Sequence, residues 1–185
     1  MQALLLRLLL ICGPISVLAA TEPRLVVDFA PIGSERLAVP SPGDQVRVTR
    51  SDSGGMTVDI APGPLTYPGV SFSFAHDTLS LSDCGYIDLA LTNTGERILS
   101  INLRVDSFPA GDMPAGRATG TAYLKPGESG HARAYFAQPT RGYAPVSPDH
   151  IKQIFIFTGK VPDAPLSFHI DSLTAGGEPG DLTSR

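Results

Sequence analysis

Apolar and polar residues alternate with a period of two along most of the chain, and turn residues separate the alternating segments. In the segment LSINLRVDS (99–107), the apolar positions are Leu99, Ile101, Leu103 and Val105. Successive side chains of a β-strand point to opposite faces, so this pattern is typical of a strand with one buried face. No stretch shows the spacing of three and four that an amphipathic helix requires. The alternation therefore predicts an all-β protein.

Other segments of the same kind follow one another, with many of the 19 glycines and 17 prolines between them. They are LVVDFA (25–30), VRVT (46–49), MTVDI (56–60), VSFSFAH (70–76), YIDLALTN (86–93), ATGTAYL (118–124), HARAYFA (131–137), IKQIFIF (151–157) and LSFHIDSL (166–173). About ten short strands without crossover helices predict a two-sheet antiparallel β-sandwich of the jelly-roll kind. Short turns further predict two hairpins, one joining 86–93 to 99–107 and one joining 118–124 to 131–137.

The N-terminal residues have the layout of a secretory signal peptide. Arg7 precedes an apolar stretch, and small residues follow it at Ala19 and Ala20. Gly13 and Pro14 interrupt the stretch, which is shorter than the roughly 20 apolar residues of a membrane-spanning helix. This layout predicts a secreted or periplasmic protein that has no membrane contact once the signal has been cleaved.

The expected organisation is a signal peptide over 1–20, a β-sandwich domain over 21–175 and a flexible tail over 176–185. Two alternatives for the leader stay open, an uncleaved membrane anchor and a lipid attached to Cys12. Cleavage leaves Cys84 as the single cysteine, so the domain cannot form an internal disulfide.

Charge and motif content exclude several classes of function. The chain has 14 Lys and Arg against 18 Asp and Glu, a formal net charge of -4, and the basic residues are scattered. Nucleic-acid binding requires a basic stripe, so we expect no nucleic-acid partner. The sequence lacks a serine-nucleophile elbow, a phosphate-binding glycine loop and paired cysteines for zinc. We therefore expect a protein without catalysis and without a cofactor.

The polar faces of two predicted strands form a candidate carbohydrate-binding surface. The strand residues concerned are Asn102, Arg104, Asp106, Arg133 and Tyr135, with Tyr67 and Tyr143 added from loops. Planar groups that make two hydrogen bonds, combined with aromatic rings, suit the hydroxyls and apolar faces of a sugar. The alternative is an ordinary solvated sheet face, because the outer faces of sandwiches carry the same residue types.

Calcium is the metal that the sequence favours, as a structural ion. Asp28 on the first strand and Asp171 on the last supply oxygen ligands if the two strands meet in the fold. His169 and Asp171 share one face of the last strand, but a solvated strand end explains this pair as well as a metal does.

Several segments together resemble the noncatalytic jelly-roll domain that precedes the barrel of bacterial β-agarases, and more broadly the galactose-binding-like carbohydrate-binding modules. They are LSDCGYIDLALTNTGER (81–97), INLRVDS (101–107), LKPGESG (124–130), DHIKQIFIF (149–157) and LSFHIDSL (166–173). The resemblance implies a secreted carbohydrate-binding protein whose partner is a polysaccharide or oligosaccharide of galactan or agar type.

The alternative is a structural or protein-interaction β-sandwich of the cell envelope, which binds an envelope protein and no sugar. Two observations keep it open. The chain contains no tryptophan, so aromatic stacking on a sugar depends on its 5 tyrosines and 8 phenylalanines. A fold by itself also does not determine a function.

Overall fold

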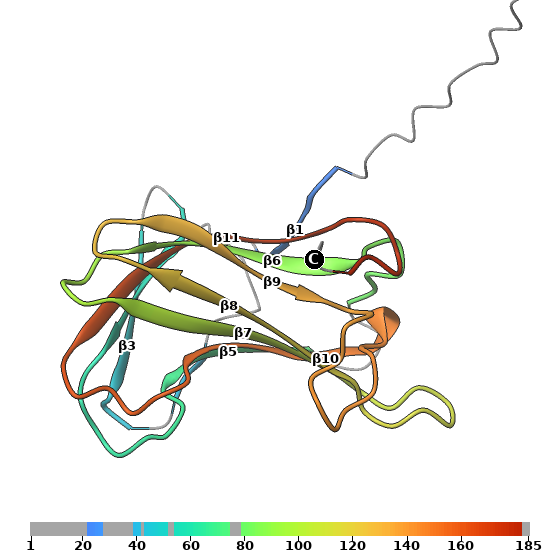
Figure 1. The fold of residues 1–185 in the computed structure, drawn as a ribbon, viewed down its shortest axis with the longest axis horizontal. Helices are drawn as coiled ribbons and strands as arrows, with labels where there is room; N and C mark the ends of the chain where they lie inside the picture. Colours follow the sequence, from blue (N-terminus) through green and yellow to red (C-terminus); the bar gives the residue numbers. More distant parts are fainter. Residues whose placement is uncertain (1–21, 28–38, 42, 52–53, 75–78, 183–185) are drawn as a thin grey trace, which may run out of the picture.

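A computed structural model describes residues 22–27, 39–41, 43–51, 54–74 and 79–182, and these form two antiparallel sheets (Figure 1). Sheet A contains β1 (Arg24–Val27), β3 (Val46–Arg50), β4 (Met56–Ile60), β6 (Tyr86–Asn93), β9 (Ser129–Tyr135) and β11 (Leu166–Gly176). Its order is β3-β4-β11-β6-β9, and β1 also pairs with β11. Sheet B contains β2 (Val39–Pro40), β5 (Gly69–Ser73), β7 (Leu99–Ser107), β8 (Arg117–Leu124) and β10 (Ile151–Thr158), in the order β2-β5-β10-β7-β8.

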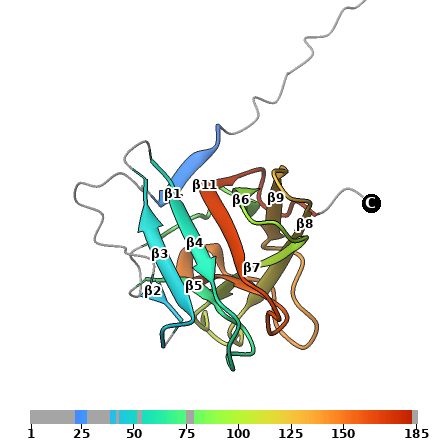
Figure 2. The ribbon, with the colours of Figure 1, turned by 90° about the vertical axis from the view of Figure 1, so that its left-hand side faces the viewer.

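The all-β prediction is confirmed, because one 3-10 turn (Pro148–His150) is the only helical element in the part of the chain described. Figure 2 shows β3, β4 and β11 side by side in sheet A. No helix among the described residues is long and apolar enough to cross a bilayer.

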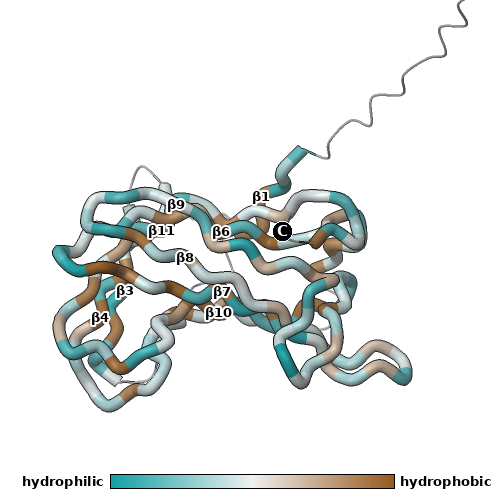
Figure 3. Tube along the Cα trace, viewed as in Figure 1, coloured by the Kyte–Doolittle hydropathy of each residue, from teal (hydrophilic) through white to brown (hydrophobic). Residues whose placement is uncertain are grey.

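The core lies between the two sheets, where the apolar positions of the alternating segments meet. Their side chains are almost completely buried, as the alternation predicted: Val58, Phe72, Leu89, Leu103, Ile154, Phe168. Figure 3 shows brown apolar stretches recurring along the strands, whereas many of the turns are teal or white. Removing apolar surface from water contributes about 25 cal/mol of free energy per Å², and this contribution holds the sandwich together. The remaining positions of each strand are left on the outer faces.

The two predicted hairpins are wrong, although the strands themselves are confirmed. β6 lies in sheet A and β7 in sheet B, and β8 lies in sheet B and β9 in sheet A. The turn after β6 therefore carries the chain across the core to the other sheet, and the turn after β8 carries it from the edge of sheet B to the adjoining edge of sheet A. Chain reversal and side-chain alternation are the same whether two strands pair edge to edge or face each other across a core. The sequence pattern does not distinguish these arrangements.

Asn93 holds the first of these crossing turns together. It is 1% exposed, and its Nδ2 donates hydrogen bonds to the carbonyl oxygens of Arg97 at 2.8 Å and Leu124 at 3.1 Å. Its Oδ1 accepts a hydrogen bond from the backbone N–H of Gly95 at 3.0 Å. One buried amide thus satisfies backbone groups of the crossing turn, at Gly95 and Arg97, and of strand β8, at Leu124.

β8 and β9 run beside each other where an edge of sheet B meets an edge of sheet A. Gly120 permits this approach, because a Cβ at that position would lie 2.1 Å from the carbonyl oxygen of Arg133. We call this line of contact the β8–β9 seam. The outer face of sheet B adjoins the outer face of sheet A across it.

The last strand extends beyond the predicted end at residue 173. A shift of register between Ile170 and Ser172 breaks the alternation, after which Leu173 and Ala175 point inward and pair with β6. Residues 177–182 follow as a turn, in which the backbone N–H of Glu178 donates a hydrogen bond to Asp181 Oδ2 at 2.9 Å. The predicted signal peptide lies outside the described residues, and so do residues 28–30 of the first predicted strand.

Candidate functional site

The predicted site residues of β7 lie on the outer face of sheet B, beside two phenylalanines of β10. Arg104 is the register partner of Phe155, and Asn102 is the register partner of Phe157. On the other side, β7 pairs with β8, where Thr119 lies opposite Arg104. Alternation along β7 and β10 directs these side chains outward, because the residues between them fill the core.

Three aromatic rings form a row that ends at Arg104. The Tyr67 and Phe157 ring centroids are 5.6 Å apart at an interplanar angle of 84°, and Phe155 stacks on Phe157 at 4.6 Å and 15°. Arg104 Cζ lies 5.2 Å from the Phe155 ring centroid and 5.8 Å from that of Phe157. Tyr67 is 55% exposed and Phe155 is half-buried, so the row presents ring surface to solvent.

A carboxylate joins this row to a second cation. Asp106 Oδ1 accepts a hydrogen bond from Arg117 Nε at 2.6 Å, and Asp106 Oδ2 forms an ion pair with Arg104 Nε at 3.0 Å. The Asp106 side chain is 12% exposed, against 25% for Arg104 and 24% for Arg117. Arg117 Cζ lies 3.9 Å from the ring centroid of Tyr143. Asp106 therefore lies beneath two guanidinium groups, of which Arg117 is held by a hydrogen bond and Arg104 by the ion pair alone, because Arg104 Nε has no hydrogen-bond partner within the described residues.

We call this surface the aromatic–arginine face. It consists of Tyr67, Asn102, Arg104, Asp106, Arg117, Tyr143, Phe155 and Phe157. The structure thus brings together five of the seven predicted carbohydrate-binding residues.

Asn102 marks one end of this face. Its Oδ1 accepts a hydrogen bond from Thr121 Oγ1 at 2.8 Å. Asn102 also lines a groove of about 970 Å³ at the end of the sandwich, together with three exposed apolar or aromatic side chains, Ile98, Tyr123 and Val161. The aromatic–arginine face therefore continues into an open groove at this end.

The other two predicted residues, Arg133 and Tyr135, lie on β9 in sheet A. Asp88 of β6 accepts hydrogen bonds there from Arg133 Nε at 2.8 Å and from His131 Nδ1 at 2.7 Å when that nitrogen carries the proton. Arg133 Cζ lies 4.2 Å from the ring centroid of Tyr86. Burial acts to lower the pKa of the Arg133 guanidinium, but hydrogen bonds to Tyr135 and Asp88 raise it above the ordinary arginine value.

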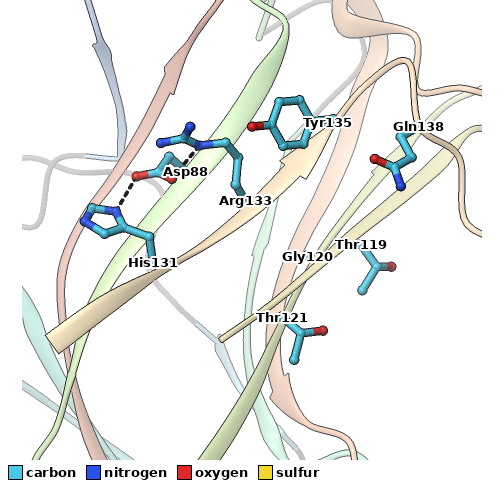
Figure 4. Close-up of a pocket in the computed structure, with 8 residues that line it drawn as sticks. All are labelled: Asp88, Thr119, Gly120, Thr121, His131, Arg133, Tyr135 and Gln138. Atoms are coloured by element: carbon cyan, nitrogen blue, oxygen red, sulfur yellow. Dashed lines mark hydrogen bonds and ion pairs between the residues drawn. The ribbon is translucent and has the colours of Figure 1, made fainter. Parts of the chain in front are cut away.

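A groove of about 610 Å³ follows the β8–β9 seam. Its lining residues are Asp88, Thr119, Gly120, Thr121, His131, Arg133, Tyr135 and Gln138. Figure 4 shows Asp88, His131 and Arg133 on one side of the groove and Thr119 and Thr121 on the other, with Gly120 between them. We call it the seam groove. The predicted site is thus divided between two adjoining surfaces, because the two strands that carry it lie in different sheets.

Sequence reasoning missed several residues of these surfaces, among them Phe155, Phe157, Arg117 and Asp88. Phe155 and Phe157 alternate with Ile154 and Ile156 in the segment IKQIFIF, and the two isoleucines are completely buried. Aromatic residues at the outward positions of an alternating strand were therefore a visible signal. Arg117 precedes the predicted strand 118–124 and gave no such signal. Asp88 falls on the outward side of a largely apolar strand. A carboxylate that becomes buried at such a position needs a charged or hydrogen-bonding partner.

The predicted calcium ligands are placed in part. Asp171 lies at the irregularity of β11, where it accepts a hydrogen bond from Thr92 Oγ1 at 3.1 Å and lies 4.0 Å from His169 Nε2. β1 pairs with β11, so the first and last strands do meet. Asp28 lies outside the described residues, and within those residues no group of three or more metal-ligating side chains comes together. Calcium binding by Asp28 and Asp171 stays a prediction.

Comparison with known proteins gives likeness in structure alone. No family model and no curated protein matches the sequence. A family 11 carbohydrate-binding module from Clostridium thermocellum, solved with a beta-1,3-1,4-mixed-linked tetrasaccharide, is similar with a TM-score of 0.62 at 14% identity, over 88% of this chain and 100% of that one. The module of that family in the cellulase Lic26A-Cel5E of the same organism is similar with a TM-score of 0.60 at 13% identity, over 90% of this chain and 100% of that one.

Agarases are similar over part of their length. One agarase matches with a TM-score of 0.63 at 9% identity, and an exo-beta-agarase matches with a TM-score of 0.61 at 10% identity. The likeness covers 86% and 84% of this chain but only 25% of each agarase. The resemblance predicted from the sequence is thus confirmed for the fold. The chain is a jelly-roll sandwich with the fold of carbohydrate-binding modules and of one region of agarases.

Proposed function

We propose that the protein binds a polysaccharide or oligosaccharide on the aromatic–arginine face and acts without catalysis. The observation that carries the proposal is the continuous row from Tyr67 through Phe157 and Phe155 to Arg104, with ring-to-ring separations of 5.6 and 4.6 Å. A sugar ring has apolar C–H faces that pack on aromatic rings, and hydroxyls around its edge that accept hydrogen bonds from a guanidinium.

The arrangement of the two arginines supports the same ligand. A guanidinium donates to two adjacent oxygens in a fixed plane, and Asp106 orients that plane for Arg117 by a hydrogen bond and forms an ion pair with Arg104. Because Asp106 is paired with these cations, its negative charge is compensated within the face. The face therefore offers aromatic surface and oriented N–H donors side by side, along a strand direction that suits an extended glycan.

The ligand we propose is a galactan of agar type, and the place of action is outside the cytoplasm. The sequence resemblance to agarase domains and the likeness in fold to two agarases support the ligand class. The signal-peptide layout of residues 1–20 supports export to the periplasm or the exterior.

Calorimetry of the protein against neutral oligosaccharides of agar, mixed-linked β-glucan and xylan tests the proposal. We expect binding, strongest for agar oligosaccharides. Phe155→Leu keeps apolar bulk but removes the ring, so affinity should fall about two- to tenfold. Phe108→Leu is the matched control, because Phe108 lies beside Lys152 and not in the aromatic row. If no glycan binds at millimolar concentration, or if Phe155→Leu binds as the unaltered protein does, the proposal is wrong.

A second candidate function, binding of a cell-envelope protein, rests on the end groove. Ile98, Tyr123 and Val161 are 72%, 73% and 52% exposed there, and contiguous exposed apolar surface is common at protein interfaces. The same calorimetry separates the two functions. Absence of glycan binding, together with capture of an envelope protein that Tyr123→Ser prevents, would favour the second.

A further inference from the structure

The seam groove directs an arginine and a histidine outward and keeps its carboxylate inside. The Asp88 side chain is 10% exposed, whereas the side chains of its partners Arg133 and His131 are 39% and 62% exposed. Asp88 engages Arg133 through Nε and His131 through Nδ1. The terminal guanidinium nitrogens of Arg133 and the Nε2 of His131 are therefore the groups that point away from this carboxylate.

The strands around the groove, which include β7 and β8 of the aromatic–arginine face, carry a formal excess of one positive charge, whereas the groove lining itself pairs Arg133 with Asp88. Strands β6, β7, β8 and β9 carry three arginines, Arg104, Arg117 and Arg133, and two carboxylates, Asp88 and Asp106, both of which are buried. The whole chain has a formal net charge of -4. An excess of cations on one part of an acidic protein attracts anions to that part.

The opposite wall of the groove supplies hydroxyl groups. Thr119 and Thr121 project from β8, and the glycine between them leaves backbone as the floor of the groove. The Thr119 hydroxyl bonds with that of Thr140 and the Thr121 hydroxyl donates to Asn102 Oδ1, and each hydroxyl oxygen retains acceptor capacity for the sugar hydroxyls beside a charged substituent. Thr119 is also the register partner of Arg104, which links this wall to the aromatic–arginine face.

We propose that the seam groove binds the acidic group of an anionic glycan, either the carboxylate of a uronic acid or a sulfate ester, with Arg133 as its main donor and His131 beside it. The inference goes beyond the proposed function, because it assigns a second surface and a charged ligand. The hydrogen bonds that fix Arg133 on Asp88 and Tyr135 hold its guanidinium ready for a planar or tetrahedral oxyanion.

The experiment follows backbone and arginine side-chain NMR signals of the ¹⁵N-labelled protein during titration. The probes are oligogalacturonate, which carries carboxylates, carrageenan oligosaccharide, which carries sulfate esters, and a neutral agar oligosaccharide. We expect at least one anionic probe to shift the signals of Thr119, Gly120 and the Arg133 Nε–H. Which of the two does so identifies the acidic group. The neutral probe should leave these signals unchanged and should shift those of Phe155 and Phe157.

Variants separate a specific site from general attraction of charge. Arg133→Gln should weaken binding of the anionic probe about tenfold or more, since it removes a charged hydrogen-bond donor. Thr119→Glu places a carboxylate on the exposed wall without disturbing Asp88. This variant should also weaken binding of the anionic probe. Arg47→Gln removes the same charge from exposed β3, at the far edge of sheet A, and is the matched control.

The inference fails if neither anionic probe shifts the seam-groove signals, or if Arg47→Gln weakens binding as much as Arg133→Gln. It also fails if Arg133→Gln and Thr119→Glu both retain the unaltered affinity. Signals of Phe155 and Phe157 that move with the neutral probe would then still support the proposed function. Conversely, seam-groove shifts with an anionic probe, together with Phe155 and Phe157 signals that the neutral probe leaves unchanged, would support this inference and contradict the proposed function.

Discussion

A single carboxylate, Asp106, pairs with two guanidinium groups on the aromatic–arginine face. Asp106 Oδ1 lies 2.6 Å from Arg117 Nε, and Asp106 Oδ2 lies 3.0 Å from Arg104 Nε. Without it, two like charges would stand beside each other on neighbouring strands. Sequence reasoning placed Asp106 among the groups that contact a sugar. Its burial beneath the arginines makes it a positioning residue instead.

Asp106→Asn keeps the shape of the side chain and removes its charge. We expect the free energy of unfolding to fall by about 1–3 kcal/mol, because two charged donors lose an ionised acceptor. Affinity for the neutral oligosaccharide should fall too, since the guanidinium planes are no longer fixed. Asp59→Asn is the control, because Asp59 is exposed and accepts a hydrogen bond from the neutral hydroxyl of Ser167. Urea denaturation and calorimetry measure both effects, and equal stability of the two variants would contradict this role.

Cys84 should be unreactive in the folded protein. Burial, the charge of Asp83 and a hydrogen bond from its Sγ to Asp83 raise the pKa of the thiol, although Arg24 acts to lower it. Alkylation by iodoacetamide at pH 8 should be at least about tenfold slower in the native protein than in urea, because the thiolate is the reactive form. Above pH 9 the unfolded chain ionises this thiol more readily, so the free energy of unfolding should decrease there as pH rises. Equal alkylation rates with and without urea would contradict this.

At the scale of elements, the strands could be predicted but their partners could not. The inward positions of β7 and β10 follow from alternation, and all of them are buried as expected. Partner choice depends on whether a short turn stays within one sheet or crosses the core, and alternation is the same in both cases. The predicted site is divided for the same reason, because Arg104 on β7 and Arg133 on β9 belong to strands that lie in different sheets.

The crossing between β6 and β7 depends on a buried amide. Asn93→Ala leaves the carbonyl oxygens of Arg97 and Leu124 without their donor, at about 1–3 kcal/mol for each buried group left unsatisfied. Thr94→Ala, next to it and exposed, should change the free energy of unfolding by no more than about 0.5 kcal/mol. Urea denaturation compares the two. A stability loss for Asn93→Ala no larger than that for Thr94→Ala would show that the turn does not depend on Asn93.

At the scale of the whole molecule, the sandwich presents adjoining surfaces of different chemistry. The aromatic–arginine face has exposed rings and oriented guanidiniums, and the seam groove next to it has hydroxyls and cations over a buried carboxylate. β8 belongs to both surfaces, with Thr119 beside Arg104 on one side and Gly120 against Arg133 on the other. A glycan bound along β7 would therefore pass close to a second set of donors.

The central claim is that the guanidinium of Arg104, placed beside the rings of Phe155 and Phe157, binds a sugar. Calorimetric titration of Arg104→Lys with a neutral agar oligosaccharide tests it most directly. Lysine keeps the charge but cannot donate to two hydroxyls in one plane, so affinity should fall about ten- to a hundredfold. Arg47→Lys on exposed β3 should bind as the unaltered protein does. An Arg104→Lys variant with unchanged affinity would contradict the account.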